Sequence, residues 1–263
     1  MTRGSVFHIS PRFIKVWQRD LKVYQKTWKI NFLPPLLEPL FYVLAFGLGL
    51  GAIVGTLSYR GMELSYVSFI APALIAIAIM TNAFYETTYA SFVRMYYQKT
   101  FDTMMATPLS LEDIITGEIV WGATKSVIAT IIMSIILSFF GLIHILWGVL
   151  LIPLALLGGI AFGALGMFFT GITPTIETFN LPIFLLITPM FLFSETFFPL
   201  TSLPSWAQKV SWALPLTHLV QACRALSTGV LTFQLIFNVL YLITFCFLFV
   251  PLSIRKMHTR LIK

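Results

Sequence analysis

The 263-residue sequence is 58% hydrophobic and only 10% charged, and its mean hydropathy is +0.89. A water-soluble domain with a polar surface cannot have this composition, so we exclude soluble classes and predict a polytopic membrane protein. The formal net charge of +7 comes from 17 Lys and Arg residues against 10 Asp and Glu residues. We attribute it to membrane topology and expect no nucleic-acid partner.

Six apolar stretches approach the roughly 20 residues that cross about 30 Å of hydrocarbon. The fifth is short and contains Pro182 and Pro189, so we expect it to be bent or completed by the segment that follows it. The predicted fold class is an all-α integral membrane protein with six transmembrane helices. The stretches are residues 30–54, 66–84, 114–140, 146–169, 179–193 and 233–250.

The distribution of basic residues predicts the orientation of the chain. Thirteen of the 17 Lys and Arg residues lie before the first span, after the second span or after the last one. Because basic residues favour the cytosolic side, both termini are expected in the cytosol. The predicted organisation is an interface helix within 1–29, a six-span membrane domain over 30–253 and a basic cytosolic tail over 254–263.

A basic amphipathic helix is expected before the first span. Six cationic side chains recur at alternating spacings of three and four residues, which places them on one side of a helix. Trp17 and other apolar residues occupy the opposite side. This pattern suits the cytosolic membrane interface, with anchoring as the favoured role and a direct part in gating as the alternative. The cationic residues are Arg12, Lys15, Arg19, Lys22, Lys26 and Lys29.

The connection over residues 94–113 is the one substantial internal cytosolic segment, which makes it the expected partner-binding site. Residues 99–106 can form a short helix that Pro108 ends. Ser110 and Asp113 have the spacing of a capping box that starts the third span. The predicted coupling residues are Lys99, Thr100, Phe101, Asp102, Thr103 and Met104.

Residues 195–218 are too polar and proline-broken to span a bilayer, yet too aromatic for a solvated loop. Pro204 and Pro215 interrupt regular helix, and Trp212 adds an amphipathic ring favoured at a membrane surface. Irregular backbone at membrane depth survives only where protein buries it or where it lines a cavity. We predict a re-entrant gate or substrate exit, and a surface-lying connection stays equally open. The predicted gate residues are Glu195, Phe197, Phe198, Pro199 and Trp206.

No catalytic, cofactor-binding or metal-binding residues are predicted. Gly117 and Gly122 have the spacing of a phosphate-binding loop, but Ala123 replaces its lysine and the stretch is a hydrophobic helix. The four histidines lack the spacing of a zinc site, and there is no nucleophile elbow. The chain is therefore not expected to be an enzyme or to hydrolyse ATP by itself.

Charged residues within or beside the spans are either structural or functional. Burying a charged side chain costs at least a few kcal/mol on insertion scales, and snorkelling or pairing between helices is favoured over a proton relay. Glu118 and Lys125 share a helix face but lie about 10 Å apart along it, too far to pair directly. The charged residues are Glu38, Glu86, Glu118, Lys125, Glu177 and Glu195.

Gly159 and Gly163 in the fourth span have GxxxG spacing, for which packing inside one subunit is favoured over a dimer contact.

Residues 195–229, ETFFPLTSLPSWAQKVSWALPLTHLVQACRALSTG, resemble the signature near the end of type-2 ABC transporter permeases. The likeness is to the branch of nodulation-factor, polysaccharide and drug exporters. It extends over nearly the whole chain, since the basic start, the six spans and the connection KTFDTMMATPLSLEDIITGE also match.

This resemblance implies a homodimer of permeases with two separately encoded ATPase subunits, which bind the ATP, in the bacterial inner membrane. By position, residues 99–106 are similar to the coupling helix, 12–28 to the interface helix and 195–215 to the extracellular re-entrant hairpins. The substrate path would lie at the dimer interface, lined by the first, second and fifth spans.

The predicted function is the permease subunit of an ATP-driven exporter in contact with membrane lipids. A lipid-linked oligosaccharide or polysaccharide is the first expected substrate and a hydrophobic drug the second. An ion-coupled secondary transporter is the alternative, although related halves and a midplane ion site are not found. A channel or a structural membrane subunit is weaker, because no filter-like motif occurs. A continuous channel and alternating access both stay open.

Overall fold

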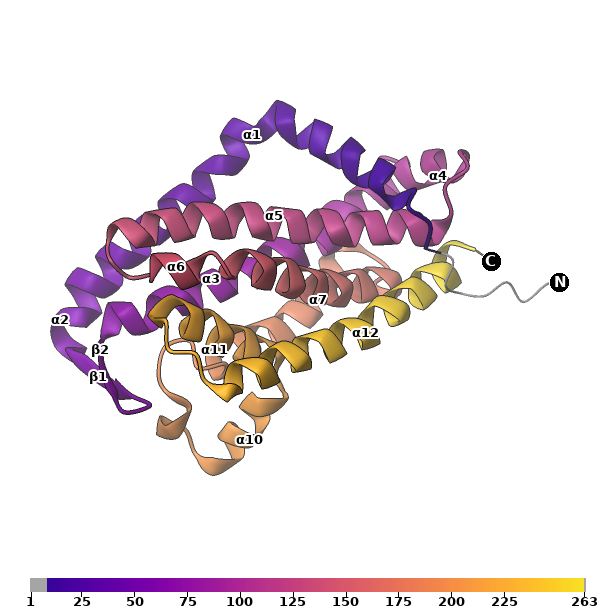
Figure 1. The fold of residues 1–263 in the computed structure, drawn as a ribbon. Coiled ribbons are helices and arrows are strands. Elements are labelled where there is room, and N and C mark those ends of the chain that lie inside the picture. Colours follow the sequence, from indigo (N-terminus) through magenta and orange to yellow (C-terminus); the bar gives the residue numbers. More distant parts are fainter. Residues whose placement is uncertain (1–8, 263) are drawn as a thin grey trace.

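The computed structural model describes residues 9–262, which form a bundle of long helices with a short β-hairpin at one end (Figure 1). Within these residues, six helical segments are long and apolar enough to cross a membrane. The chain is a multi-pass membrane protein, and the predicted fold class is confirmed. The segments are Phe13–Gly47, Tyr66–Tyr97, Leu111–Phe139, Leu146–Ile172, Ile176–Phe193 and Phe233–Leu261.

Helix α1, Phe13–Leu44, joins the expected interface helix and the first span without a break at residue 29. It contains Pro34, Pro35 and Pro39, each of which removes a backbone hydrogen bond and favours bending. The helix accordingly arches away from the bundle between its two ends (Figure 1). It continues into a π-helical segment, η1 (Ala45–Leu50), and the short α2 (Gly51–Val54).

A two-stranded antiparallel hairpin, β1 (Thr56–Tyr59) and β2 (Met62–Ser65), follows α2. Arg60 and Gly61 form the two-residue turn, both with positive φ, at 51° and 79°. Such turns match the natural twist of paired strands. The sequence analysis left these residues as a connection between the first two spans and predicted no strands, because Arg60 occupies a position where Asn or Gly is the usual signal.

The centre of the bundle is α3, Tyr66–Tyr85, which continues through two π-helical segments, η2 (Glu86–Ala90) and η3 (Val93–Tyr97). It packs between α5 (Leu111–Phe139) and α7 (Leu151–Ile172). A Cβ atom on Gly159 of α7 would lie 2.6 Å from the Cα of Ala123 on α5. The GxxxG face therefore packs inside the subunit, as favoured from the sequence.

The α4 end of the bundle holds the short helix α4, Thr100–Met105. Ser110 and Asp113 form the predicted capping box at the start of α5. Helix α12, Phe233–Leu261, packs along α7 and returns to this end (Figure 1).

The remaining elements connect or complete these helices. Helix α6 (Ile145–Gly148) follows α5. The fifth span is one helical segment, Ile176–Phe193, whose helix type changes along its length; its predicted bend stays a prediction. It comprises η4 (Ile176–Phe179), α8 (Asn180–Pro182), η5 (Ile183–Ile187) and α9 (Thr188–Phe193). The region before α12 contains η6 (Leu200–Ser202), α10 (Ser205–Ala213) and α11 (Pro215–Thr228).

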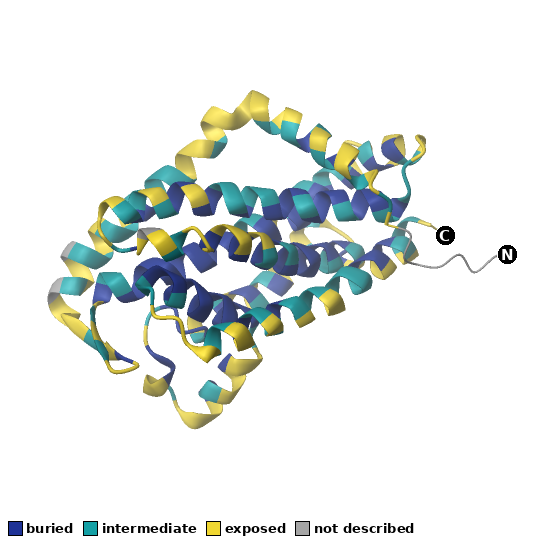
Figure 2. Cartoon of the chain, viewed as in Figure 1, coloured by how far each residue is buried: buried dark blue, intermediate teal, exposed yellow. Residues whose placement is uncertain are grey.

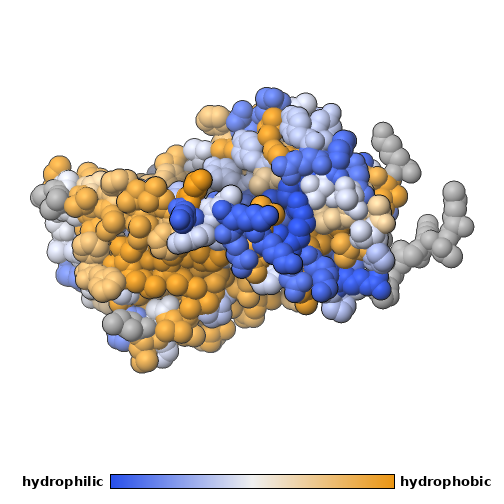
Figure 3. Space-filling model, turned by 90° about the horizontal axis from the view of Figure 1, so that it is seen from above, coloured by the Kyte–Doolittle hydropathy of each residue, from blue (hydrophilic) through white to orange (hydrophobic). Residues whose placement is uncertain are grey.

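The surface has the polarity expected of a membrane protein. Buried residues concentrate in the inner helices, while α1 and α12 carry many exposed residues (Figure 2). Hydrophilic side chains gather over the half of the α1 side that includes the α4 end, and the opposite half is largely hydrophobic (Figure 3). Exposed apolar side chains face lipid in a membrane rather than water. Prominent examples are Phe41, Ile53, Phe139, Phe184, Leu185 and Phe247.

Candidate functional site

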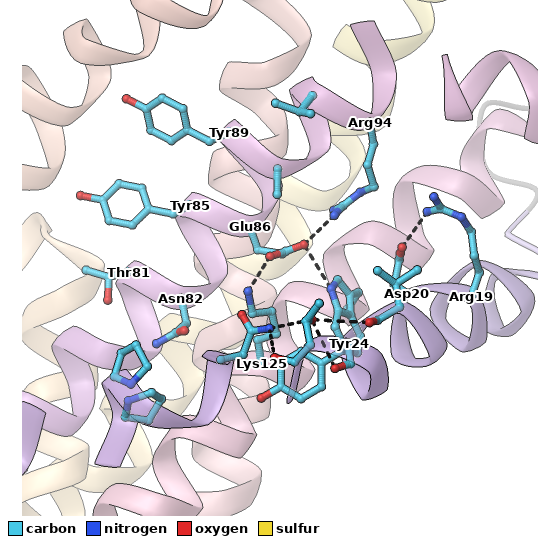
Figure 4. A pocket seen from close by; sticks show the side chains of 18 of the residues that line it. Arg19, Asp20, Tyr24, Thr81, Asn82, Tyr85, Glu86, Tyr89, Arg94 and Lys125 are labelled. Carbon is cyan, nitrogen blue, oxygen red and sulfur yellow. Dashed lines mark hydrogen bonds and ion pairs between the residues drawn. The ribbon is translucent and has the colours of Figure 1, made fainter. Parts of the chain in front are cut away.

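A cavity of about 850 Å³ lies beneath the arch of α1, between that helix, the α3–η3 segment and α5 (Figure 4). We call it the arch cavity. Its wall from α3 and η2 carries Thr81, Asn82, Tyr85 and Tyr89, spaced at helical intervals on one face. These hydroxyl, amide and aromatic groups are unusual in a helix whose other residues are mostly buried and apolar. The arch cavity therefore presents hydrogen-bonding groups inside a membrane-spanning region.

A buried ion-pair network forms the end of this cavity. Arg94 of η3 donates from Nε to both carboxylate oxygens of Glu118 at 3.0 and 3.1 Å, and its Nη2 also binds Glu118. Its Nη1 lies 2.8 Å from Oε1 of Glu86. Lys125 lies 2.8 Å from the other oxygen of Glu86, and Trp121 donates to Oε1 at 3.1 Å. Each carboxylate is thus compensated by a cation from another helix.

The sequence analysis identified three members of this network but not their partners. Glu118 and Lys125 do not pair with each other; each pairs with a residue of the α3–η3 segment. Snorkelling or pairing between helices was the favoured interpretation, and pairing is found for Glu86, Glu118 and Lys125. The sequence analysis counted Arg94 only among the basic residues that follow the second span and indicate the orientation of the chain. The π-helical turns at 86–90 and 93–97 widen the helix, and no spacing rule revealed that Glu86 and Arg94 both face α5.

Asp20 brings α1 into the same site. It is 4% exposed, and its Oδ1 accepts a hydrogen bond of 2.7 Å from Arg19. Among the residues that the structure describes, its Oδ2 has no hydrogen-bond partner. A buried carboxylate oxygen without a donor is costly, which makes this atom a candidate for contact with a bound molecule. Glu38, further along α1, also lines the arch cavity.

The predicted interface-helix residues divide between solvent and the bundle. Lys15 and Lys22 are exposed, whereas Trp17 donates from Nε1 to the hydroxyl of Thr124 on α5 at 2.9 Å. Arg12 donates to the carbonyl of Pro108 at 2.6 Å, beside α4. The face of α1 expected to lie in lipid therefore packs partly on α5.

The predicted coupling residues form α4 and its start. Lys99, Asp102 and Thr103 are exposed, while Phe101 and Met104 are buried in a cluster with residues of α5, α7 and α12. Thr100 is half-buried. The exposed side of α4 is available to a partner, and its buried side connects it to the permease core.

Replacing Phe101 with alanine should destabilise the α4 end rather than alter a docking surface, because its side chain is fully buried. Truncating a buried Phe costs about 3–5 kcal/mol of unfolding free energy. Thermal unfolding of the detergent-purified variant measures this effect. An unchanged melting temperature would contradict the packing, and Thr103→Ala on the exposed side is the control.

The predicted gate residues lie away from α4. Among them, Glu195 is held by several contacts with Arg224. Glu195 has a φ of 60°, a strained value for a residue with a side chain. Arg224, which is 1% exposed, donates from Nη2 to the Glu195 carbonyl at 2.8 Å and from Nε to the Phe69 carbonyl at 3.2 Å. Its Nη1 lies 3.5 Å from the Glu195 carboxylate. Arg224 is therefore a buried residue that holds this segment in place.

A polar chain extends from Glu195 to α12. Gln221 donates to the Glu195 carboxylate at 2.9 Å, and Asn238 of α12 donates to Gln221 at 3.4 Å. Oδ1 of Asn238 lies 2.9 Å from Nδ1 of His218, whose Nε2 lies 2.9 Å from the Trp212 carbonyl oxygen. These bonds join α10, α11 and α12, and the sequence analysis missed Gln221 and Asn238.

The other predicted gate residues separate by exposure. Phe197 packs on Phe191 with ring centroids 5.0 Å apart, and Pro199 is buried. Phe198 and Trp206 are exposed by 37% and 62%. Helix α11 is buried along most of its length, whereas α10 is largely exposed, so the re-entrant gate and the surface-lying connection both stay predictions.

Burial also controls the titratable groups around α11. Desolvation, followed by the negative charge of Glu195, raises the pKa of Tyr59, so its phenol remains neutral. Burial likewise raises the pKa of the Cys223 thiol, which is completely enclosed. Cys223 thus remains a protonated apolar side chain.

Together, the six spans, the polar arch cavity and the exposed α4 define a membrane transport protein. The ABC-2 type transporter family matches residues 11–228, and the chain belongs to this family. Membership implies an ABC transporter in which an ATPase partner works with this membrane domain. The membrane domain is not itself the catalyst.

Curated relatives agree with this assignment. The chain is 36% identical over 220 residues to Nodulation protein J of Rhizobium leguminosarum bv. trifolii, covering 84% of this chain and 82% of the relative. It is 34% identical over 219 residues to Nodulation protein J of Rhizobium meliloti, covering 82% and 81%. It is 23% identical over 209 residues to the inner membrane transport permease YadH of Escherichia coli K12, covering 80% of each chain.

Proposed function

We propose that this chain is the permease subunit of an ATP-driven exporter of an amphipathic substrate. It works as a homodimer with two ATPase subunits in the bacterial inner membrane, with both termini in the cytosol. The observation that carries this proposal is the position of the polar arch cavity. The ion-pair network of Arg94 forms the end of this cavity, and Arg94 itself belongs to the helical segment that leads into α4.

The proposed mechanism follows from this connection. Arg94 belongs to η3, which ends at Tyr97, three residues before α4 begins at Thr100. A displacement of α4 by an ATPase therefore acts on the helix that carries Arg94 and on the wall of the arch cavity. The hydrogen bonds of Ser10 and Arg12 to Asp113 and Pro108 connect the beginning of α1 to the same region. A displacement of α4 thus acts on both the α1 wall and the α3–η3 wall of the arch cavity.

The cavity supports an amphipathic substrate with a hydroxyl-rich head group. Thr81, Asn82 and Tyr85 offer hydrogen-bonding groups, and Asp20 holds a carboxylate oxygen that has no donor among the described residues. The cationic groups of Arg94 and Lys125 are already engaged by carboxylates. A saccharide attached to a lipid fits these groups best, and the relatives named Nodulation protein J and YadH support an exporter. A hydrophobic drug is the second candidate.

The docking part is tested by replacing Asp102 with arginine. Asp102 is exposed on α4, so the change should leave folding intact and reduce co-purification of the ATPase subunit by at least about tenfold, the effect of losing a buried interfacial charge contact. Lys209→Glu, an exposed charge reversal on α10, is the matched control. Normal co-purification with Asp102→Arg would contradict the docking site.

The direction of energy coupling is tested in sealed proteoliposomes that contain the permease and its ATPase. Export should require ATP. Flux driven by an ion gradient without nucleotide would instead support a secondary transporter.

Replacing Trp206 with alanine should impair export and leave ATPase binding unchanged. Its ring is 62% exposed and lies 6.2 Å from the ring of Phe193, so truncation alters the surface of the exit segment more than the core. Phe198→Ala should behave in the same way. Initial export rates and co-purification of the ATPase check both statements, and normal export would exclude these two side chains from the exit.

A further inference from the structure

Two adjoining cavities lie around the end of α5, and they share no residue with the arch cavity. Residues of α5, α6 and the start of α7 line the first, and the second also contacts β2, the start of α3 and the end of α11. The first is an apolar groove of about 410 Å³. Ile131, Ile135 and Phe139 follow one another at four-residue intervals, so the groove runs lengthwise along the last turns of α5. Its walls include Ile131, Ile135, Phe139, Ile143, Val149 and Ile152.

The second cavity has a volume of about 780 Å³ and lies beyond the end of α5. It shares Ser138 and Ile143 with the groove, so the two cavities adjoin. Polar side chains are more frequent here, among them His144, Ser227 and Thr228. The backbone N–H of His144 donates to the Ser227 carbonyl at 2.8 Å and holds the loop after α5 against the end of α11.

Ser227 gives this polar cavity an unfilled hydrogen-bonding position. The residue is 2% exposed, and its hydroxyl has no partner within residues 9–262. Buried hydroxyls are normally hydrogen-bonded, and an unpaired one carries a desolvation cost. A bound molecule that supplies an acceptor oxygen at this wall removes the cost.

We propose that the joined cavities bind one glycerophospholipid of the surrounding membrane. An acyl chain occupies the groove along α5, and the phosphodiester lies in the polar cavity beside Ser227 and His144. The apolar part lies along a membrane-spanning helix and the polar part at that helix's end, which matches the order of chain and head group in one leaflet. Phosphate oxygens are strong acceptors for hydroxyl and imidazole donors.

The surroundings favour a membrane lipid over the transported molecule. Ile135 and Phe139 are 54% and 84% exposed on a span, so the groove opens toward lipid. The arch cavity lies beneath α1 on a different set of residues. Because the polar cavity contains the last residues of α11, a bound lipid would hold the end of the helix that carries Arg224.

The groove is tested with the full-length permease in nanodiscs of phosphatidylethanolamine that contain an analogue with a photoreactive group on its acyl chain. Mass spectrometry of the labelled peptides should show labelling concentrated over residues 131–152. Ile135→Trp fills the groove and should reduce this labelling about fivefold, the effect expected from losing the burial of about one methylene group of the acyl chain. Leu248→Trp on α12 is the matched control, since Leu248 has the same exposed fraction of 54% and lines neither cavity.

The test compares the labelling of the α5 groove with the labelling of the exposed face of α12. Wild-type labelling that is equal on α5 and α12, or labelling unaffected by Ile135→Trp, would overturn the groove assignment and indicate unspecific boundary lipid. Thermal unfolding of Ile135→Trp confirms that the variant is folded before its labelling is interpreted.

The head-group contact is tested by comparing the same analogue with a diacylglycerol that carries identical chains and no phosphate. The phospholipid should label the site at least about tenfold more strongly, as expected for one hydrogen bond to a charged group. Ser227→Ala should remove that preference without reducing stability, because it deletes an unpaired buried hydroxyl. Equal labelling by both analogues in the wild-type protein, or a preference that survives in Ser227→Ala, would overturn the phosphate assignment.

Discussion

Replacing Arg94 with alanine should abolish transport and lower the free energy of unfolding by about 3–5 kcal/mol, the usual effect of removing one partner from a buried ion pair. The guanidinium binds Glu86 and Glu118 together, and Glu118 is completely buried. Without Arg94, the Glu118 carboxylate keeps only the hydroxyl of Ser91 among the described contacts. Thermal unfolding in detergent and ATP-driven flux in proteoliposomes measure the two effects.

A double variant distinguishes a structural role of this network from a functional one. Arg94→Met combined with Glu118→Met removes both charges at once, and such replacements often restore stability. Glu86 keeps its bonds to Lys125 and Trp121. We expect the double variant to fold nearly as well as the wild type and its ATPase partner to hydrolyse ATP without transport. Wild-type transport by this variant would show that the network serves folding alone.

The membrane spans could be predicted from sequence because their signal is compositional. A long apolar run identifies a span whatever its neighbours are, and all six were found. The arch of α1 was harder to foresee. Pro34, Pro35 and Pro39 predict a weakened helix, but the arch also depends on tertiary contacts, such as the packing of Val16 and Trp17 on α5, that hold one limb in place.

The site could be predicted only in part because its contacts join distant segments. Glu86 and Lys125 stood out as charges in apolar surroundings, whereas Arg94 and Asp20 resembled ordinary residues of a span end and an interface helix. Their proximity depends on the π-helical turns after α3 and on the position of α1, and neither has a one-dimensional pattern. The same reason applies to Arg224, whose partner Glu195 lies 29 residues earlier.

Replacing Arg224 with methionine should loosen the exit segment and leave α4 intact. Arg224 is buried and binds the Glu195 carbonyl, so it holds the backbone at a residue whose φ of 60° is unfavourable by roughly 1–3 kcal/mol. The change also leaves the Glu195 carboxylate with the amide of Gln221 and the backbone N–H of Leu200 as its remaining donors.

The expected loss of stability is again about 3–5 kcal/mol, because one charge of a buried pair is left behind. Hydrogen exchange should increase over residues 194–215 and stay unchanged over 100–113, and the ATPase should still co-purify. Lys209→Met removes an exposed charge from the same region and is the control. Since the two ends of the bundle are held by separate ion pairs, faster exchange at α4 in Arg224→Met would contradict their independence and would point to one rigid unit that couples α4 directly to the exit.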